Sequence, residues 1–169
     1  MFLAPGNNRN SSHTLAFFGR LACLTAFWFL VVVPCQGQTI LYAEASLPAS
    51  VNSNTLVDMP GLVFSLPALS PSANVALITL DVPQPYAEGT QYPGLQFAIV
   101  VDTKTVAIGG FTYPLEKPPS FGRMPTTIVV RVPLLAGKPQ LVRAQWVGVR
   151  GSIGRIDSFA SLSAILGKK

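Results

Sequence analysis

The sequence has little charge and few of the side chains that usually carry catalysis. Only 11% of its 169 residues are charged, and it contains a single histidine. Its seven acidic residues are scattered, without the supported pair of carboxylates that a glycosidase needs. They form no cluster either, so we expect neither an enzyme nor a metal or other cofactor. The basic residues are scattered as well, whereas nucleic-acid binding requires a stripe of cations, so we expect no nucleic-acid partner.

An apolar run near the N-terminus indicates a secretory signal. Residues 21–33 are almost purely apolar, and Pro34 ends the run. This run of 13 residues is short for a spanning helix, which needs roughly 20. We therefore expect a signal peptide over residues 1–37, cleaved before Gln38, and a secreted protein. Two alternatives stay open: an uncleaved membrane anchor, and a lipoprotein modified at Cys35.

Disulfides are also absent from the mature chain that this cleavage predicts. The two cysteines, Cys23 and Cys35, both lie in the predicted signal. The remaining segment, residues 38–169, has the length of one ordinary domain. Without crosslinks, its stability must come from a buried core and from association of subunits.

What the sequence does contain is a series of short segments rich in valine, isoleucine, leucine and threonine. Clusters of proline, glycine, serine and asparagine separate them, and no segment keeps a helical period over ten residues. The pattern predicts an all-β domain. The predicted strands cover residues 39–45, 61–66, 75–82, 95–102, 106–113, 127–132, 140–147 and 158–166.

The last of these segments, residues 158–166, alternates most clearly. Every second residue from Ala160 to Leu166 is apolar, and the other face, from Phe159 to Ile165, is rather apolar too. A strand with one solvated face is more polar on that side. We therefore expect a β-sandwich that packs against neighbouring subunits.

Two connections between the predicted strands are rich in proline. Pro83, Pro85 and Pro93 flank residues 86–90, and four further prolines surround residues 120–123. Proline fixes φ, so these loops should be stiff. Stiff loops on a β scaffold suit a preformed ligand site.

Two arginines stand out in a chain that is short of polar chemistry. Arg123 and Arg150 occur among hydroxyl-bearing residues, namely Tyr86, Thr112, Tyr113 and Ser120. A planar guanidinium can donate to the hydroxyls of a neutral polyol while an aromatic ring covers its C–H face, which favours sugar binding. By spacing alone, the arginines could equally form surface ion pairs and the tyrosines belong to the core. Asp157 is expected to anchor the backbone or an arginine.

Several motifs, in order along residues 55–167, resemble a known lectin family. The most specific are Val149-Arg150-Gly151-Ser152 and the run that begins Ile156-Asp157-Ser158-Phe159. The others lie at residues 56–62, 82–87, 93–99, 110–113, 122–125 and 145–146. The chain is similar to the TNF-like, fucose-binding lectin family of the Burkholderia superlectin N-terminal domain.

This resemblance implies a TNF-like jelly-roll β-sandwich over residues 38–169 that assembles as a homotrimer. It also implies three sites for L-fucose or fucosylated glycans, each shared by two subunits and independent of calcium. One protomer would supply Tyr86, Ser120 and Arg123 to a site. Its neighbour would supply Thr112, Tyr113 and Arg150.

The sequence departs from the family pattern at four nearby positions. A tyrosine that lines the sugar is Gln96 here, and a threonine is Phe121; we regard these two residues as candidate walls of the site. A family aspartate is Ile108, and a family histidine is Arg155. These changes motivate an alternative function, a TNF-like protein-interaction module that has lost sugar binding.

Overall fold

The structure is a computed structural model that describes residues 38–169, and within this range it consists of strands joined by turns, with no helix. The predicted signal peptide and its cleavage site lie outside the described residues. The strands are β1 (Ile40–Glu44), β2 (Ala49–Val51), β3 (Val57–Leu66), β4 (Val75–Val82), β5 (Pro85–Glu88), β6 (Gly94–Val101), β7 (Lys104–Thr112), β8 (Thr126–Pro133), β9 (Gln140–Val149), β10 (Ile153–Ile156) and β11 (Ser161–Gly167). No element in this range is a helix that could cross a membrane.

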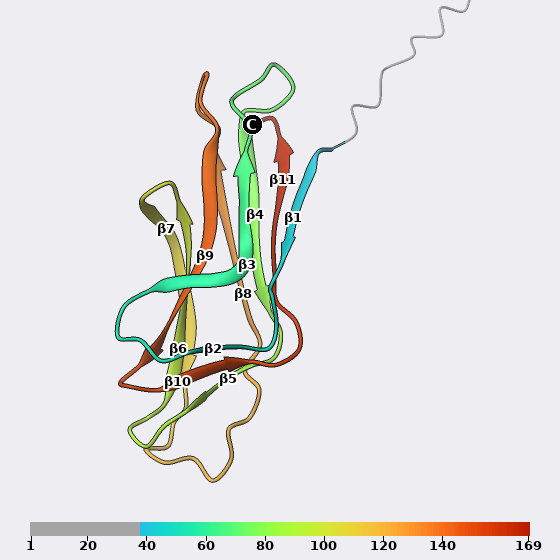
Figure 1. Ribbon diagram of the computed structural model, residues 1–169. Coiled ribbons are helices and arrows are strands. Elements are labelled where there is room, and N and C mark those ends of the chain that lie inside the picture. Colours follow the sequence, from blue (N-terminus) through green and yellow to red (C-terminus); the bar gives the residue numbers. More distant parts are fainter. Residues whose placement is uncertain (1–37) are drawn as a thin grey trace, which may run out of the picture. The chain divides into compact units, whose positions relative to one another are not determined.

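The strands form three antiparallel sheets. Two sheets have four strands, in the orders β1-β11-β4-β8 and β3-β9-β6-β7. The third has the order β2-β10-β5, and its short strands run across one end of the longer ones (Figure 1). The expectation of an all-β sandwich is therefore confirmed for this part of the chain.

Alternating apolar side chains hold the two larger sheets together. Along β4, Ala76, Ile78, Leu80 and Val82 are all fully buried, and along β11 the alternate positions from Leu162 to Leu166 point into the same core. These apolar side chains alternate with period two, so a single face of each strand is buried. The alternation predicted for the last strand is confirmed and the face from Leu162 to Leu166 is the inward one, although the strand begins at Ser161 and not at Ser158.

The sheet β3-β9-β6-β7 contributes the largest rings of the core. Trp146 on β9 and Phe97 on β6 are fully buried, with their ring centroids 6.5 Å apart. On β7, Gly109 lets the opposite sheet approach, because a Cβ there would lie 3.0 Å from the side chain of Ile128 on β8. Trp146 is therefore a core residue and not a platform for a ligand.

The three short strands β2, β5 and β10 were not predicted. Residues 86–90 were expected to form a loop, but Tyr86 to Glu88 pair with β10. The sequence of strand β10 resembles a turn because it contains Gly154. In the structure, however, this glycine packs against the core, and a Cβ on it would lie 2.1 Å from the side chain of Leu95. Packing contacts of this kind, between residues far apart in sequence, decide such short strands.

Strand β3 begins earlier than predicted, at Val57, and bends sharply along its length (Figure 1). Its register against β9 shifts between Asp58 and Val63. At the bend, Gly61 has a φ of 83°, and a Cβ on it would lie 2.5 Å from the carbonyl oxygen of Glu44. The bend carries the first part of β3 toward the end of the sandwich where the short sheet lies.

The outer face of the sheet β1-β11-β4-β8 carries five large exposed apolar side chains. We call this set the apolar outer face; its members are Ile40, Tyr42, Leu77, Val129 and Ile165. Ile40 is 64% exposed and Val129 is 56% exposed. The strand register aligns Ile40 with Ile165 and Ile165 with Leu77, so these three side chains form one row across the sheet.

Candidate functional site

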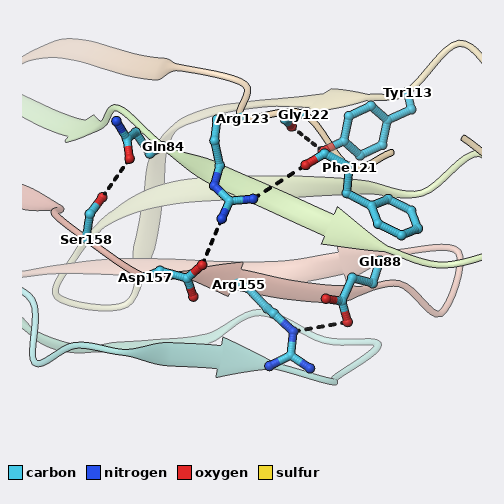
Figure 2. Close-up of polar contacts among 9 residues, drawn as sticks. All are labelled: Gln84, Glu88, Tyr113, Phe121, Gly122, Arg123, Arg155, Asp157 and Ser158. Carbon is cyan, nitrogen blue, oxygen red and sulfur yellow. Dashed lines mark hydrogen bonds and ion pairs between the residues drawn. The ribbon is translucent and has the colours of Figure 1, made fainter. Parts of the chain in front are cut away.

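Arg123 occupies the centre of a polar cluster at the end of the sandwich. It lies in the connection between β7 and β8, and its guanidinium carbon is 3.7 Å from the centroid of the Tyr86 ring on β5. Its Nη2 donates to Asp157 Oδ2 at 2.9 Å, and its Nη1 donates to the carbonyl oxygen of Phe121 at 3.4 Å (Figure 2). The ring, the carboxylate and the carbonyl together fix the plane of the guanidinium.

Asp157 is held in place by its own surroundings. It follows β10, and the next residue, Ser158, donates from its hydroxyl to Gln84 Oε1 at 3.2 Å (Figure 2). The Arg123 and Asp157 side chains are 43% and 47% exposed, so the ion pair between them is accessible to solvent. The expectation that Asp157 anchors an arginine is confirmed.

Tyr86 stands between two ion pairs. It lies opposite Arg155 in the register of β5 and β10. Arg155 Nε is 3.0 Å from Glu88 Oε2, but its N–H is not directed at that oxygen, so the contact is an ion pair more than a hydrogen bond (Figure 2). Burial raises the pKa of the Tyr86 hydroxyl, and the carboxylate of Asp157 adds to the rise. The hydroxyl therefore stays protonated at neutral pH and can both donate and accept a hydrogen bond.

Tyr113 anchors the loop that carries Arg123. Its ring is buried, packs edge-on against Phe111 with centroids 5.5 Å apart, and lies 6.1 Å from the ring of Phe121. Its hydroxyl donates to the carbonyl oxygen of Gly122 at 2.5 Å (Figure 2). Within one chain, Tyr113 thus supports the loop. Ser120 precedes Phe121 in this loop and is exposed beside it.

Arg150 belongs to a second group of predicted site residues. It has a φ of 53° in the turn between β9 and β10, and its Nη1 donates to the carbonyl oxygen of Tyr92 at 3.4 Å. The turn is fixed by the buried Ser152, whose hydroxyl donates to the carbonyl oxygen of Val149 and accepts from the amide of Gly94 at 3.1 Å.

Thr112 and Gln96 lie close to this turn. Thr112 ends β7 opposite Gly94, which in turn pairs with Val149 on β9. Gln96 lies two residues further along β6, and both side chains are exposed. They line a hollow of about 410 Å³ together with Ile108, Gly109, Gly110 and Phe111.

The predicted site residues therefore fall into two groups. Tyr86, Tyr113, Phe121 and Arg123 come together around the loop after β7. Thr112, Gln96 and Arg150 lie at the ends of β6, β7 and β9. Among residues 38–169, none of the hydrogen bonds, ion pairs or ring contacts joins Arg150 to Arg123.

Sequence reasoning missed two participants, Glu88 and Tyr92. Glu88 was not linked to Arg155 because β5 was taken for a loop. Tyr92 touches Arg150 through its carbonyl oxygen, and its ring lies 6.0 Å from the guanidinium. No local pattern in the sequence marks Tyr92, because its contact with Arg150 depends on the turn between β9 and β10.

The electrostatics of the cluster do not resemble a metal centre. No group of three or more histidine, cysteine or acidic side chains lies close together within residues 38–169. The two carboxylates nearest Tyr86, those of Asp157 and Glu88, are each paired with an arginine. What the cluster offers a ligand is a set of guanidinium and hydroxyl donors beside an aromatic ring.

Comparison with known proteins identifies one family. Residues 44–165 match the family described as the Bc2l-C N-terminal domain. No curated protein matches the sequence. Among solved structures, the chain is similar to dimeric latent PorU from Porphyromonas gingivalis, with 11% identity and a TM-score of 0.48 over 77% of this chain. It is also similar to the insecticidal δ-endotoxin Cry8Ea1 from Bacillus thuringiensis, with 15% identity and a TM-score of 0.41 over 72% of this chain. The chain spans only 13% and 20% of the lengths of these two proteins.

Proposed function

The chain belongs to the family of the Bc2l-C N-terminal domain, and on this premise we propose that it is a secreted, calcium-independent lectin. The family membership itself indicates a lectin-like module and favours a non-enzymatic role. The proposed ligand is L-fucose, alone or at the end of a glycan, bound between subunits of a homotrimer. The observation that carries the proposal is the guanidinium of Arg123, fixed between the Tyr86 ring and Asp157 on an accessible surface.

The geometry around Arg123 suits a neutral sugar. The contacts with Asp157 and Phe121 use only part of the five N–H donors of a guanidinium, so the others are free to bind sugar hydroxyls. Tyr86 and Ser120 add hydroxyl groups, and Phe121 adds an apolar surface for C–H groups. Because such a ligand is uncharged, its affinity should depend little on salt.

A homotrimer would complete this site. Arg123 and Arg150 belong to two groups that no contact joins within the described chain. In a trimer, Thr112 and Arg150 of one subunit would face Tyr86, Ser120 and Arg123 of the next, while Tyr113 supports the Arg123 loop of its own chain. A lectin with three weak sites would gain avidity on a glycan-covered surface.

Two features of the fold support trimer formation. The strand orders β1-β11-β4-β8 and β3-β9-β6-β7 agree with a TNF-like jelly roll of two packed sheets. In addition, the apolar outer face exposes five large apolar side chains on one sheet. Contiguous apolar surface of this kind marks interaction sites in soluble proteins, and a second copy of the chain is the occupant that we propose.

Secretion and calcium independence rest on separate arguments. The apolar run at residues 21–33 supports a signal peptide over residues 1–37, cleaved before Gln38. Mass spectrometry of the exported protein should give a mature chain that begins at Gln38. Calcium takes six to eight oxygen ligands, whereas both carboxylates near Tyr86 already face arginines. Binding should therefore survive a chelator.

Isothermal titration with L-fucose tests the proposed site. The variants Arg123→Ala and Arg150→Ala should each lose binding, because a guanidinium with several hydrogen bonds to a ligand carries much of the affinity. Lys138→Ala removes an exposed cation elsewhere and serves as the control. Full binding by both arginine variants would show that the sugar lies elsewhere.

A second candidate is a protein-interaction module that has lost sugar binding. The apolar outer face and the departures at Gln96, Ile108, Phe121 and Arg155 favour it. Titration with L-fucose, D-mannose and L-galactose separates the two functions, provided that the sample is first shown to be trimeric. If none of the three sugars binds, the result would favour the interaction module.

A further inference from the structure

The hollow beside Thr112 has a composition unlike that of the Arg123 cluster. It lies on the outer face of β6 and β7, where Gln96 stands directly opposite Gly110. Because glycine has no side chain, the position of β7 directly opposite Gln96 leaves the Gln96 side chain uncovered. Thr112 bounds the hollow at one end, and Ile108 bounds it toward the other end of β7. Its volume of about 410 Å³ is within the range of small-molecule sites.

The lining of the hollow is uncharged. Ile108 and Val149 supply apolar side-chain surface, and the side chains that can form hydrogen bonds are Gln96 and Thr112. Ile108 is 55% exposed, so its apolar surface is available to a ligand. A charged group placed here would lose hydration and meet no counter-ion, whereas a methyl group would gain contacts.

We propose that this hollow is a subsite for an acyl group on the unit that neighbours the bound sugar, as in an N-acetylated hexose. The inference rests on the proposed lectin function, because Thr112 is shared by the sugar site and the hollow. The Gln96 amide would donate to the acyl carbonyl oxygen. The acyl methyl would pack against Ile108, which lies on the same exposed face of β7 as Gly110 and Thr112.

Matched disaccharides test this subsite. The probes are L-fucosyl-N-acetylglucosamine and L-fucosyl-glucose of the same linkage, which differ only in the acetamido group, compared for several linkages. We expect about fivefold tighter binding of the acetylated member in at least one pair. This factor is smaller than the roughly tenfold or greater effect of a fully buried methylene group, because the hollow is open to solvent. Equal affinities in every pair would overturn the inference.

A substitution in the hollow tests whether the preference for the acetylated disaccharide arises there. Ile108→Asp introduces a charge into the hollow, so it should abolish the preference while affinity for methyl fucoside stays unchanged. Val63→Asp is the matched control, because it changes an exposed β-branched residue of the same sheet outside the hollow. A preference that persists in Ile108→Asp would also overturn the inference.

Binding of methyl fucoside distinguishes failure of the proposed function from failure of the subsite. If wild-type protein does not bind methyl fucoside, the proposed function is wrong and so is the subsite that depends on it. If it binds methyl fucoside but shows no acyl preference, only the subsite is wrong.

Discussion

Replacing Asp157 by asparagine separates the role of this residue in binding from its role in stability. The carboxylate accepts from Arg123 at 2.9 Å, and both side chains are nearly half exposed. Exposed ion pairs of this kind contribute at most about 1 kcal/mol, so the melting temperature of Asp157→Asn should fall by no more than about 4 °C. The fold should otherwise be intact.

The effect on sugar affinity should be larger. Without the carboxylate, Arg123 is restrained by the Tyr86 ring and the Phe121 carbonyl alone, so ligand binding must order the guanidinium. Ordering a long side chain costs about 0.5–1.5 kcal/mol, and the affinity for L-fucose should therefore fall about threefold to tenfold.

Titration calorimetry and thermal unfolding measure the two quantities side by side. Asp58→Asn is the matched control, because it removes the comparable ion pair between Asp58 and Arg143, 3.2 Å long and outside the Arg123 cluster. It should change stability by a similar amount and leave the sugar affinity unaltered. An unchanged affinity in Asp157→Asn would refute the positioning role, and an equal loss in Asp58→Asn would show that the effect is not local.

Three further predictions concern stability and assembly. Ser152→Ala should destabilise the domain by about 1–3 kcal/mol in urea unfolding, because it leaves the buried amide of Gly94 without its acceptor; Ser120→Ala, at an exposed site, should not. Val129→Asp should shift the protein from trimer to monomer in light scattering, because it places a charge in the apolar outer face, whereas Val63→Asp should remain trimeric. Burial raises the pKa of Tyr113 above its ordinary value of 10.0, so the unfolded chain ionises first and stability should fall as pH rises through about 10. Tyr113→Phe should be less stable at neutral pH and should lack this contribution to the alkaline fall.

The sequence pattern revealed the long strands and not the short ones. Alternation along β4 and β11 is visible locally, because every second side chain enters the core. Strand β10 carries no such signal, since Gly154 appears there only because Leu95 and Val51 pack against it. Strand β5 starts at Pro85 and was read as a loop for the same reason: its pairing partner lies far along the chain.

The candidate site was predictable in its residue types and not in its geometry. The guanidinium of Arg123 and the ring of Tyr86 could be named from their chemistry, but their stacking depends on how the loop after β7 meets β5. That Asp157 would hold an arginine was expected, and the choice of Arg123 came from the fold. The ion pair of Arg155 with Glu88 needed the register of β5 and β10, which local propensity does not specify.

In the proposed trimer, each sugar site uses Arg123 from one subunit and Arg150 from its neighbour. Refolding Arg123→Ala chains together with Arg150→Ala chains tests it most directly, with native mass spectrometry to count mixed trimers and calorimetry to count sites. We expect no binding by either variant alone and a single restored site in each mixed trimer, where an intact Arg123 meets an intact Arg150. Mixed trimers that form but bind no L-fucose would contradict the account.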